Sequence, residues 1–155
     1  MPGDIINISL DEQSIVRRNA DIEHERKVAI FDLLEDNHFK ITDGHEGPYD
    51  LVLRLEENRL VLDLRDGDGK DLEEVKLQLT PFRKIIKDYF LICESYFNAI
   101  KTATPSQIEA IDMGRRGLHN EGSELLRDRL VDRIEMDFDT ARRLFTLVCV
   151  LHIRG

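Results

Sequence analysis

The chain contains few cysteines and prolines and no tryptophan. Its 155 residues contain no tryptophan, four prolines and two cysteines. Cys93 and Cys149 both lie in apolar runs, and neither belongs to a C-x-x-C pair of the kind that marks a zinc or redox site. The sequence therefore predicts buried, reduced thiols and a cytoplasmic location, since disulfides persist in oxidising compartments.

Long apolar segments are also missing. The longest apolar stretch, residues 144–153, spans about ten residues, whereas a helix that crosses a bilayer needs about 20. Residues 1–7 have neither the basic start nor the apolar centre of a signal peptide. We expect a soluble protein with no membrane partner.

The third deficit is positive charge. The chain has 22 Lys and Arg against 31 Asp and Glu, giving a net charge of −9. Binding to nucleic acid or to anionic lipid requires a surplus of positive charge on one face, so both partners are disfavoured. A nucleic-acid binder would need the three arginine doublets on one face. These doublets are Arg17-Arg18, Arg115-Arg116 and Arg142-Arg143.

The remaining composition is that of a globular protein. Hydrophobic residues make up 41% of the chain and charged residues 34%, which suits a packed core and argues against disorder. The length favours one domain over residues 1–155. A domain of this size buries roughly 70% of its unfolded-chain surface, so it can fold without a disulfide or a metal.

The first half of the chain is rich in strand patterns. Apolar residues alternate with polar ones over residues 5–10, 51–55, 60–64 and 75–79, which predicts four strands. The last three follow one another through short turn-rich links, which predicts an antiparallel meander with one wet face. Apolar residues recur at helical spacing over residues 20–36, so we expect a helix there.

The second half is predicted to be helical. Thr80-Pro81 is typical of a helix start with Thr80 as the capping residue, and an apolar stripe follows it from Phe82 to Ile100. Thr104 and Gln107 have the spacing of a capping box that opens a further helix, predicted to run to about Glu135. Residues 139–153 fit either a helix or a strand.

These elements predict an α+β fold: a small antiparallel β-meander packed against an N-terminal helix and a C-terminal helical hairpin or three-helix layer. The helices must cover the apolar face of the sheet, because no other element is available to do so.

Residues 112–123 form the most unusual segment. On a helical projection, Arg115 falls inside an apolar arc, and Asp112, His119 and Ser123 lie along the edge of that arc. Three glycines in this segment weaken a helix by about 1 kcal/mol each relative to alanine. Local inconsistency of this kind is typical of functional sites.

Two interpretations of this segment remain open. In the first, it forms a polar pocket in which His119 acts as an acid or base, with Asp112 nearby as a second catalytic candidate. The candidate binding residues of such a pocket are Arg115, Arg116, Asn120 and Ser123. In the second, Arg115 pairs with a carboxylate at the core edge, Asp112 pairs with Arg116, and the glycines permit close packing or break the helix.

No cofactor or metal is predicted. The sequence contains no phosphate-binding G-x-x-x-x-G-K-[ST] motif, no dinucleotide fingerprint and no nucleophile elbow. His38, Asp43, His45 and Glu46 lack the spacing of a ligand motif, and residues 66–69 fit a hairpin turn better than a calcium loop.

Four segments carry a resemblance to a known family: residues 11–30, 57–60, 117–122 and 139–145. Through them the chain resembles an uncharacterised bacterial protein family of the UPF type, found mainly in alphaproteobacteria, over nearly its whole length. The resemblance implies no activity, cofactor or catalytic residue.

Function is therefore left between two hypotheses. The first is a non-enzymatic cytoplasmic interaction or regulatory module, with a protein partner or a second copy of the chain left open. The second is a small enzyme that acts on a phosphorylated or nucleotide ligand through Arg115, Arg116 and His119. A cleft shared by His119, an arginine and a carboxylate would favour the enzyme, whereas a His119 packed tightly against the sheet would count against it.

Overall fold

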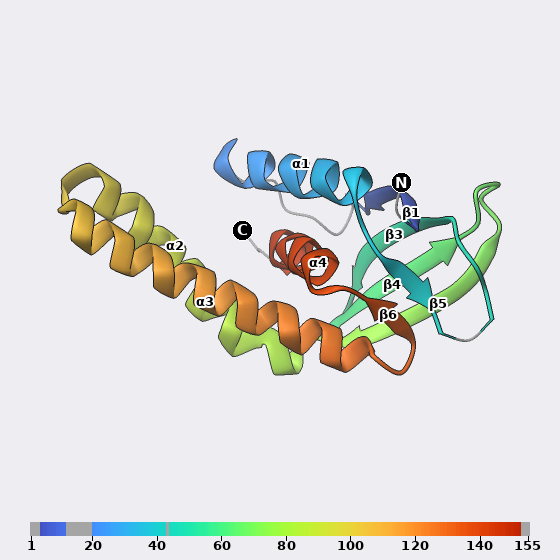
Figure 1. The fold of residues 1–155 in the computed structure, drawn as a ribbon. Helices are drawn as coiled ribbons and strands as arrows, with labels where there is room; N and C mark the ends of the chain where they lie inside the picture. Colours follow the sequence, from blue (N-terminus) through green and yellow to red (C-terminus); the bar gives the residue numbers. More distant parts are fainter. Residues whose placement is uncertain (1–3, 12–19, 43, 153–155) are drawn as a thin grey trace.

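A computed structural model describes residues 4–11, 20–42 and 44–152 of the chain (Figure 1). Its elements, in chain order, are β1 (Ile5–Leu10), α1 (Ala20–Glu35), β2 (Phe39–Ile41), β3 (Tyr49–Glu56), β4 (Arg59–Arg65), β5 (Asp71–Gln78), the short 3-10 helix η2 (Thr80–Phe82), α2 (Arg83–Thr102), α3 (Pro105–Leu130), β6 (Ile134–Met136) and α4 (Phe138–His152). The predicted α+β class is confirmed.

The main sheet has the strand order β1-β3-β4-β5. The pairs β3–β4 and β4–β5 are antiparallel, which confirms the predicted meander. The pair β1–β3 is parallel, so the sheet is mixed; the sequence predicted the strand at residues 5–10 but not its neighbour. Alternation shows which face of a strand is buried but not which strand lies beside it, and α1 supplies the long crossover that a parallel pair requires.

A second sheet was not predicted. Strands β2 and β6 are three residues each and pair antiparallel, with Phe39 opposite Met136 and Ile41 opposite Ile134. The helix predicted to run to about Glu135 therefore ends earlier, at Leu130, and the chain turns into β6. Three-residue strands are too short to give a periodic signal, so only the long-range pairing defines them.

Helix α4 forms the centre of the molecule. It lies between α1 and α3 beside the sheet (Figure 1). The consecutive residues 147–151 are each at most 4% exposed, and five residues in a row cover more than a full turn of the helix. A helix that is apolar on all sides is one that is covered on all sides. Residues 138–152 are therefore a helix, which resolves the choice that β-branched residues had left open.

The α2/α3 hairpin is well defined at its turn. The Thr104 hydroxyl accepts a hydrogen bond from the Gln107 backbone N–H at 3.2 Å, and the Gln107 side chain accepts one from the Thr104 N–H at 3.1 Å. This confirms the predicted capping box. The prediction for Thr80 is wrong, because its side chain does not cap a helix and instead accepts a hydrogen bond from Asn58 at 2.6 Å.

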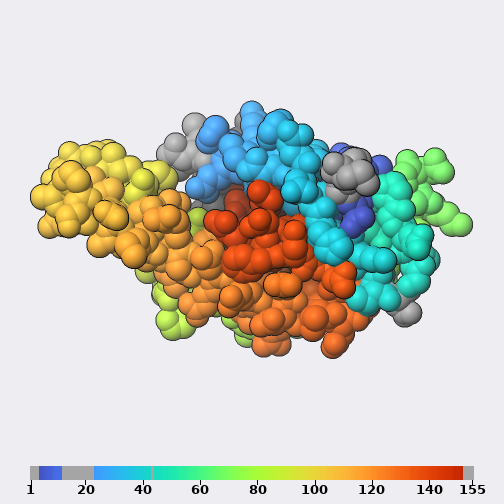
Figure 2. Space-filling view, viewed as in Figure 1, coloured from blue at the N-terminus to red at the C-terminus, as the bar shows by residue number. Residues whose placement is uncertain are grey.

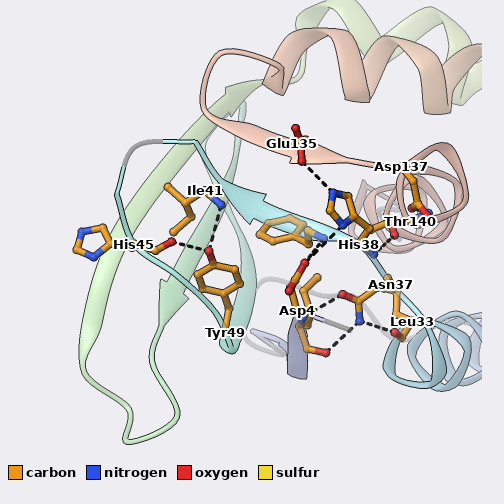
Figure 3. A network of polar contacts seen from close by, with 12 residues as sticks. Asp4, Leu33, Asn37, His38, Ile41, His45, Tyr49, Glu135, Asp137 and Thr140 are labelled. Atoms are coloured by element: carbon orange, nitrogen blue, oxygen red, sulfur yellow. Dashed lines mark hydrogen bonds and ion pairs between the residues drawn. The ribbon is translucent and has the colours of Figure 1, made fainter. Parts of the chain in front are cut away.

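A polar network joins β1 to α1 and to the second sheet (Figure 3). Asn37, only 7% exposed, accepts a hydrogen bond from Ile5 N and donates to the carbonyls of Ile5 and Leu33. His38 lies between Glu135, at 2.9 Å, and Asp4, at 3.7 Å. Asn37 therefore pairs with Ile5 as a neighbouring strand would, which fixes the end of α1 against β1.

None of the helices in the described part of the chain combines the length and the apolarity that crossing a bilayer requires.

Candidate functional site

A pocket of about 450 Å³ is lined by residues of helices α1, α3 and α4 and by one residue of α2. Its lining residues are His24, Glu25, Val28, Ala29 and Asp32 from α1, Tyr89 from α2, Arg115, Arg116 and His119 from α3, and Asp139, Arg142, Arg143 and Thr146 from α4. The volume lies in the range that holds small organic ligands. Helices far apart in the sequence therefore build one concave polar site.

The arginine doublet of α3 is anchored by Asp112. Arg115 donates from Nε at 3.1 Å and from Nη2 to Asp112 Oδ1, and Arg116 Nε lies 3.2 Å from Asp112 Oδ2. The Arg116 pair confirms the predicted contact at i, i+4, and the carboxylate that pairs with Arg115 is that of Asp112, three residues before it. The hydrogen bond from Arg115 holds the pKa of the Asp112 carboxyl below its usual value, so Asp112 stays ionised.

Arg115 has a second contact that fixes its plane. Its guanidinium carbon lies 4.7 Å from the centre of the Tyr96 ring on α2, within the range of a cation–π interaction. Asp112 and Tyr96 together hold Arg115 at the mouth of the pocket, while Arg116 remains 59% exposed and uses only Nε for its ion pair. Arg116 thus keeps its two terminal nitrogens for other contacts.

His119 is packed among helices rather than against the sheet. Its ring lies 5.4 Å from that of Tyr89 and 5.2 Å from that of Phe145, both edge to face. Its Nε2 is 2.8 Å from the Thr146 hydroxyl on α4. Burial, followed by the charges of Arg142 and Arg115, lowers the pKa of His119 to about 4, so the imidazole is neutral at pH 7.

The other two predicted binding residues lie apart from the pocket lining. Ser123 is completely buried, and its hydroxyl donates to the His119 carbonyl at 2.7 Å and lies 3.5 Å from His119 Nδ1. Asn120 is exposed on α3. Ser123 therefore contacts His119 from within the core, and Asn120 does not line the pocket.

Two of the three glycines of α3 permit close packing without breaking the helix. A side chain at Gly122 would place its Cβ 2.2 Å from the Phe145 ring, which no packing tolerates, and one at Gly114 would meet Ile92 at 2.8 Å. Helix α3 is continuous through both positions. Gly122 thus lets α3 approach α4 closely enough for His119 to reach Thr146.

The structure adds residues that sequence reasoning missed. The Arg142-Arg143 doublet of α4 joins the doublet of α3 at one pocket, which Glu25 and Asp32 of α1 also line. The doublet is visible in the sequence, but nothing in its spacing indicates that α3 is its neighbour. The Arg17-Arg18 doublet lies outside the described residues.

Charge is divided unevenly between the walls of the pocket. Four arginines come from α3 and α4, where Arg142 Nη1 makes a long contact of 4.0 Å with Asp139. Arg143 has no ion-pair partner within the ranges that the structure describes. Across the same ranges, no three His, Cys, Asp or Glu side chains are grouped as a metal site requires. The arginines of the pocket therefore all come from α3 and α4.

The fold and the site define an α+β protein with a polar, arginine-lined pocket between its helices. The chain belongs to the uncharacterised protein family UPF0262, whose profile matches residues 3–154. It is 65% identical to the UPF0262 protein of Rhodospirillum rubrum over 151 residues, which cover 97% of this chain and 93% of that protein.

Other relatives also come from alphaproteobacteria. The chain is 62% identical to the UPF0262 protein of Paramagnetospirillum magneticum, covering 97% of this chain and 96% of that protein. It is 60% identical to the family member of Azorhizobium caulinodans, covering 99% and 96%. No solved structure matches the chain. The family resemblance found in the sequence is thus confirmed, and it brings no known function.

Proposed function

We propose that this chain is a non-enzymatic binding module whose pocket holds a small molecule with an anionic group, such as a phosphate. The observation that carries the proposal is the convergence of two arginine doublets, from α3 and α4, on one pocket of about 450 Å³. In a chain with a net charge of −9, four arginines and three carboxylates line one concave site, so the pocket lining is positive by one charge.

The α4 doublet is the part of the wall that is available to a ligand. Arg115 is held by Asp112 and Tyr96, whereas Arg142 makes one long contact and Arg143 has no ion pair with a described residue. A guanidinium binds a phosphate or carboxylate through two parallel hydrogen bonds. Arg142, Arg143 and the free end of Arg116 are therefore the expected anion contacts.

The two carboxylates that α1 contributes to the pocket lining limit the classes of ligand that can bind. Glu25 and Asp32 of α1 face the pocket and are hydrogen-bond acceptors when ionised. A bare anion would meet these carboxylates unfavourably. In a molecule that combines a phosphate with hydroxyl or amino groups, the phosphate can pair with the arginines and the other groups can donate hydrogen bonds to the carboxylates. Nucleotides, sugar phosphates and phosphorylated amino acids are therefore the ligand classes that fit.

The state of His119 favours binding over acid–base catalysis. An efficient acid or base has a pKa near the working pH, whereas the pKa of His119 is about 4. Its Nε2 is bonded to Thr146, and aromatic rings pack against its faces and edges. Asp112 is likewise committed to two arginines. His119 and Asp112 are thus better suited to hold the pocket in shape than to transfer a proton.

Calorimetric titration and thermal shift test the proposal. The probes are inorganic phosphate, nucleoside monophosphates, sugar phosphates and phosphoserine. At least one should raise the melting temperature of the wild type, and R142A/R143A should weaken its binding at least tenfold, because two charge-assisted contacts are lost. The matched control R127A/R129A removes two exposed arginines elsewhere and should bind as the wild type does.

A second readout is specific to the pocket. Because the charges of Arg142 and Arg115 help to lower the pKa of His119, a bound anion should raise that pKa, as followed by NMR of the imidazole. The proposal is wrong if no probe binds, or if the control loses as much affinity as the pocket variant. Turnover of a bound probe that is lost in H119Q would instead support the enzyme hypothesis.

A further inference from the structure

The apolar stripe of α2 continues beyond the part of the molecule that covers it. Phe82 and Ile86 are 0% and 1% exposed at the start of the hairpin, and Tyr89 is 6% exposed. Further along the same face, Phe97 and Ile100 are 45% and 51% exposed. The spacing of these residues is that of a core stripe throughout, so the pattern is one that a partner normally buries.

The distal end of the α2/α3 hairpin, residues 91–111, projects past α1 and α4 (Figure 2). We call this segment the tip. Its composition differs from that of the rest of the chain, because only Glu94, Lys101 and Glu109 are charged within it. Depletion of charge together with an exposed aromatic side chain, here Phe97, is typical of the core of a protein interface.

We propose that the tip is a dimer interface at which α2 packs antiparallel against α2 of a second copy of this chain, with the two-fold axis beside Phe97. The proposal is independent of the pocket. It makes the hairpins of the two copies a four-helix assembly, in which the exposed stripe of each copy covers that of the other.

Charge complementarity identifies the second copy as the occupant. Glu94 and Lys101 are seven residues apart, and therefore lie on the same face of α2, beside Phe97. Their midpoint lies next to Phe97. In an antiparallel pair centred there, Glu94 of each copy meets Lys101 of the other, so one symmetric contact forms two ion pairs. Neither side chain has an ion-pair partner among the described residues, and both are exposed.

The distribution of charge along the chain also favours contact between two copies through the tip. Two acidic residues and one basic residue give the tip a net charge of −1, so the remaining residues carry −8 of the total of −9. Two copies repel each other over most of their surface. Contact through the tips keeps the strongly acidic parts apart.

Analytical ultracentrifugation from about 1 to about 100 µM, the range of weak self-association, tests the proposal. The wild type should form a dimer in this range, and F97E should raise the dissociation constant at least tenfold because it places two carboxylates at the axis. The control F31E changes an apolar residue of α1 that is 63% exposed and outside the tip, and should dimerise as the wild type does.

Exchanging the charges of Glu94 and Lys101, which are both exposed, tests the antiparallel pairing of the two α2 helices. Each single variant, K101E or E94K, replaces two attractive pairs by two repulsive ones and should weaken dimerisation about tenfold. The double variant E94K/K101E restores both pairs and should recover it. A mixture of the two single variants should form a heterodimer, because glutamates at 94 and 101 then face lysines.

Three results would overturn the proposal. The first is a wild type that stays monomeric at every concentration tested. The second is a dimer that F31E disrupts and F97E does not. The third is the absence of recovery in both the double variant and the mixture, which would place the second copy elsewhere. If F97E fails to fold, the charge-exchange variants still decide the question.

Discussion

The two ends of the α2/α3 hairpin carry the same amphipathic pattern in opposite surroundings. At the end nearest the sheet, the stripe residues are buried, Tyr89 contacts Phe145 of α4, and Gly122 brings α3 into contact with the same ring. At the tip, Phe97 and Ile100 are half exposed. The pattern of a helix thus states which face is apolar, whereas the rest of the fold decides whether that face becomes core or surface.

The largest effect is expected where the hairpin packs most closely. In G122A, a methyl group would lie 2.2 Å from the Phe145 ring, so α3 and α4 must separate. We expect the free energy of unfolding to fall by about 3 kcal/mol, measured by urea denaturation.

The ring is the group that clashes, so its removal provides the control. Adding F145L to G122A should recover part of the loss, although F145L alone is destabilising because it removes buried apolar surface. A G122A protein as stable as the wild type would show that α3 and α4 are not packed as closely as described.

The next effect concerns pH. Because the pKa of His119 is lowered from 6.5 to about 4 in the folded chain, the unfolded chain binds the extra proton first as pH falls. This costs stability between pH 6.5 and 4, by roughly 2 kcal/mol at pH 5. The variant H119Q should therefore lose about 2 kcal/mol less than the wild type between pH 7 and pH 5, measured by denaturation at both values. An equal loss in both proteins would contradict the prediction.

A smaller effect, an increase in stability, is expected for glycine substitutions within α3. Gly117 has open space around it, so G117A should stabilise the chain by about 0.5–1 kcal/mol through helix propensity alone. G114A should gain less, because its methyl group would displace the flexible end of Ile92 at 2.8 Å. Thermal unfolding of both variants checks this order, and a G117A that is less stable than the wild type would contradict it.

The smallest effect on stability is expected at the tip. Phe97 is 45% exposed, so F97E should change the free energy of unfolding by less than about 0.5 kcal/mol, provided the measurement is made at a concentration where the chain is monomeric. A loss of several kcal/mol would mean that Phe97 belongs to the core of the monomer, and the contrast between the two ends would disappear.

Much of the candidate site was accessible from the sequence because its contacts are local. Asp112, Arg115 and Arg116 lie three and four residues apart on one helix, and the helical repeat alone places them together. The contacts of His119 with Tyr89, Phe145 and Thr146 join three helices, and the sequence contains no signal for them. The same holds for the α1 carboxylates that face the arginines.

The sequence by itself determined the α+β class, the meander and the capping box at Thr104, since each depends on hydrophobic period or local hydrogen bonding. Only the tertiary structure decided that β1 pairs parallel to β3, that residues 39–41 and 134–136 form a second sheet, and that two arginine doublets share a pocket. These features depend on contacts between segments distant in the chain, which are set by the burial of all apolar faces together and not by any one segment.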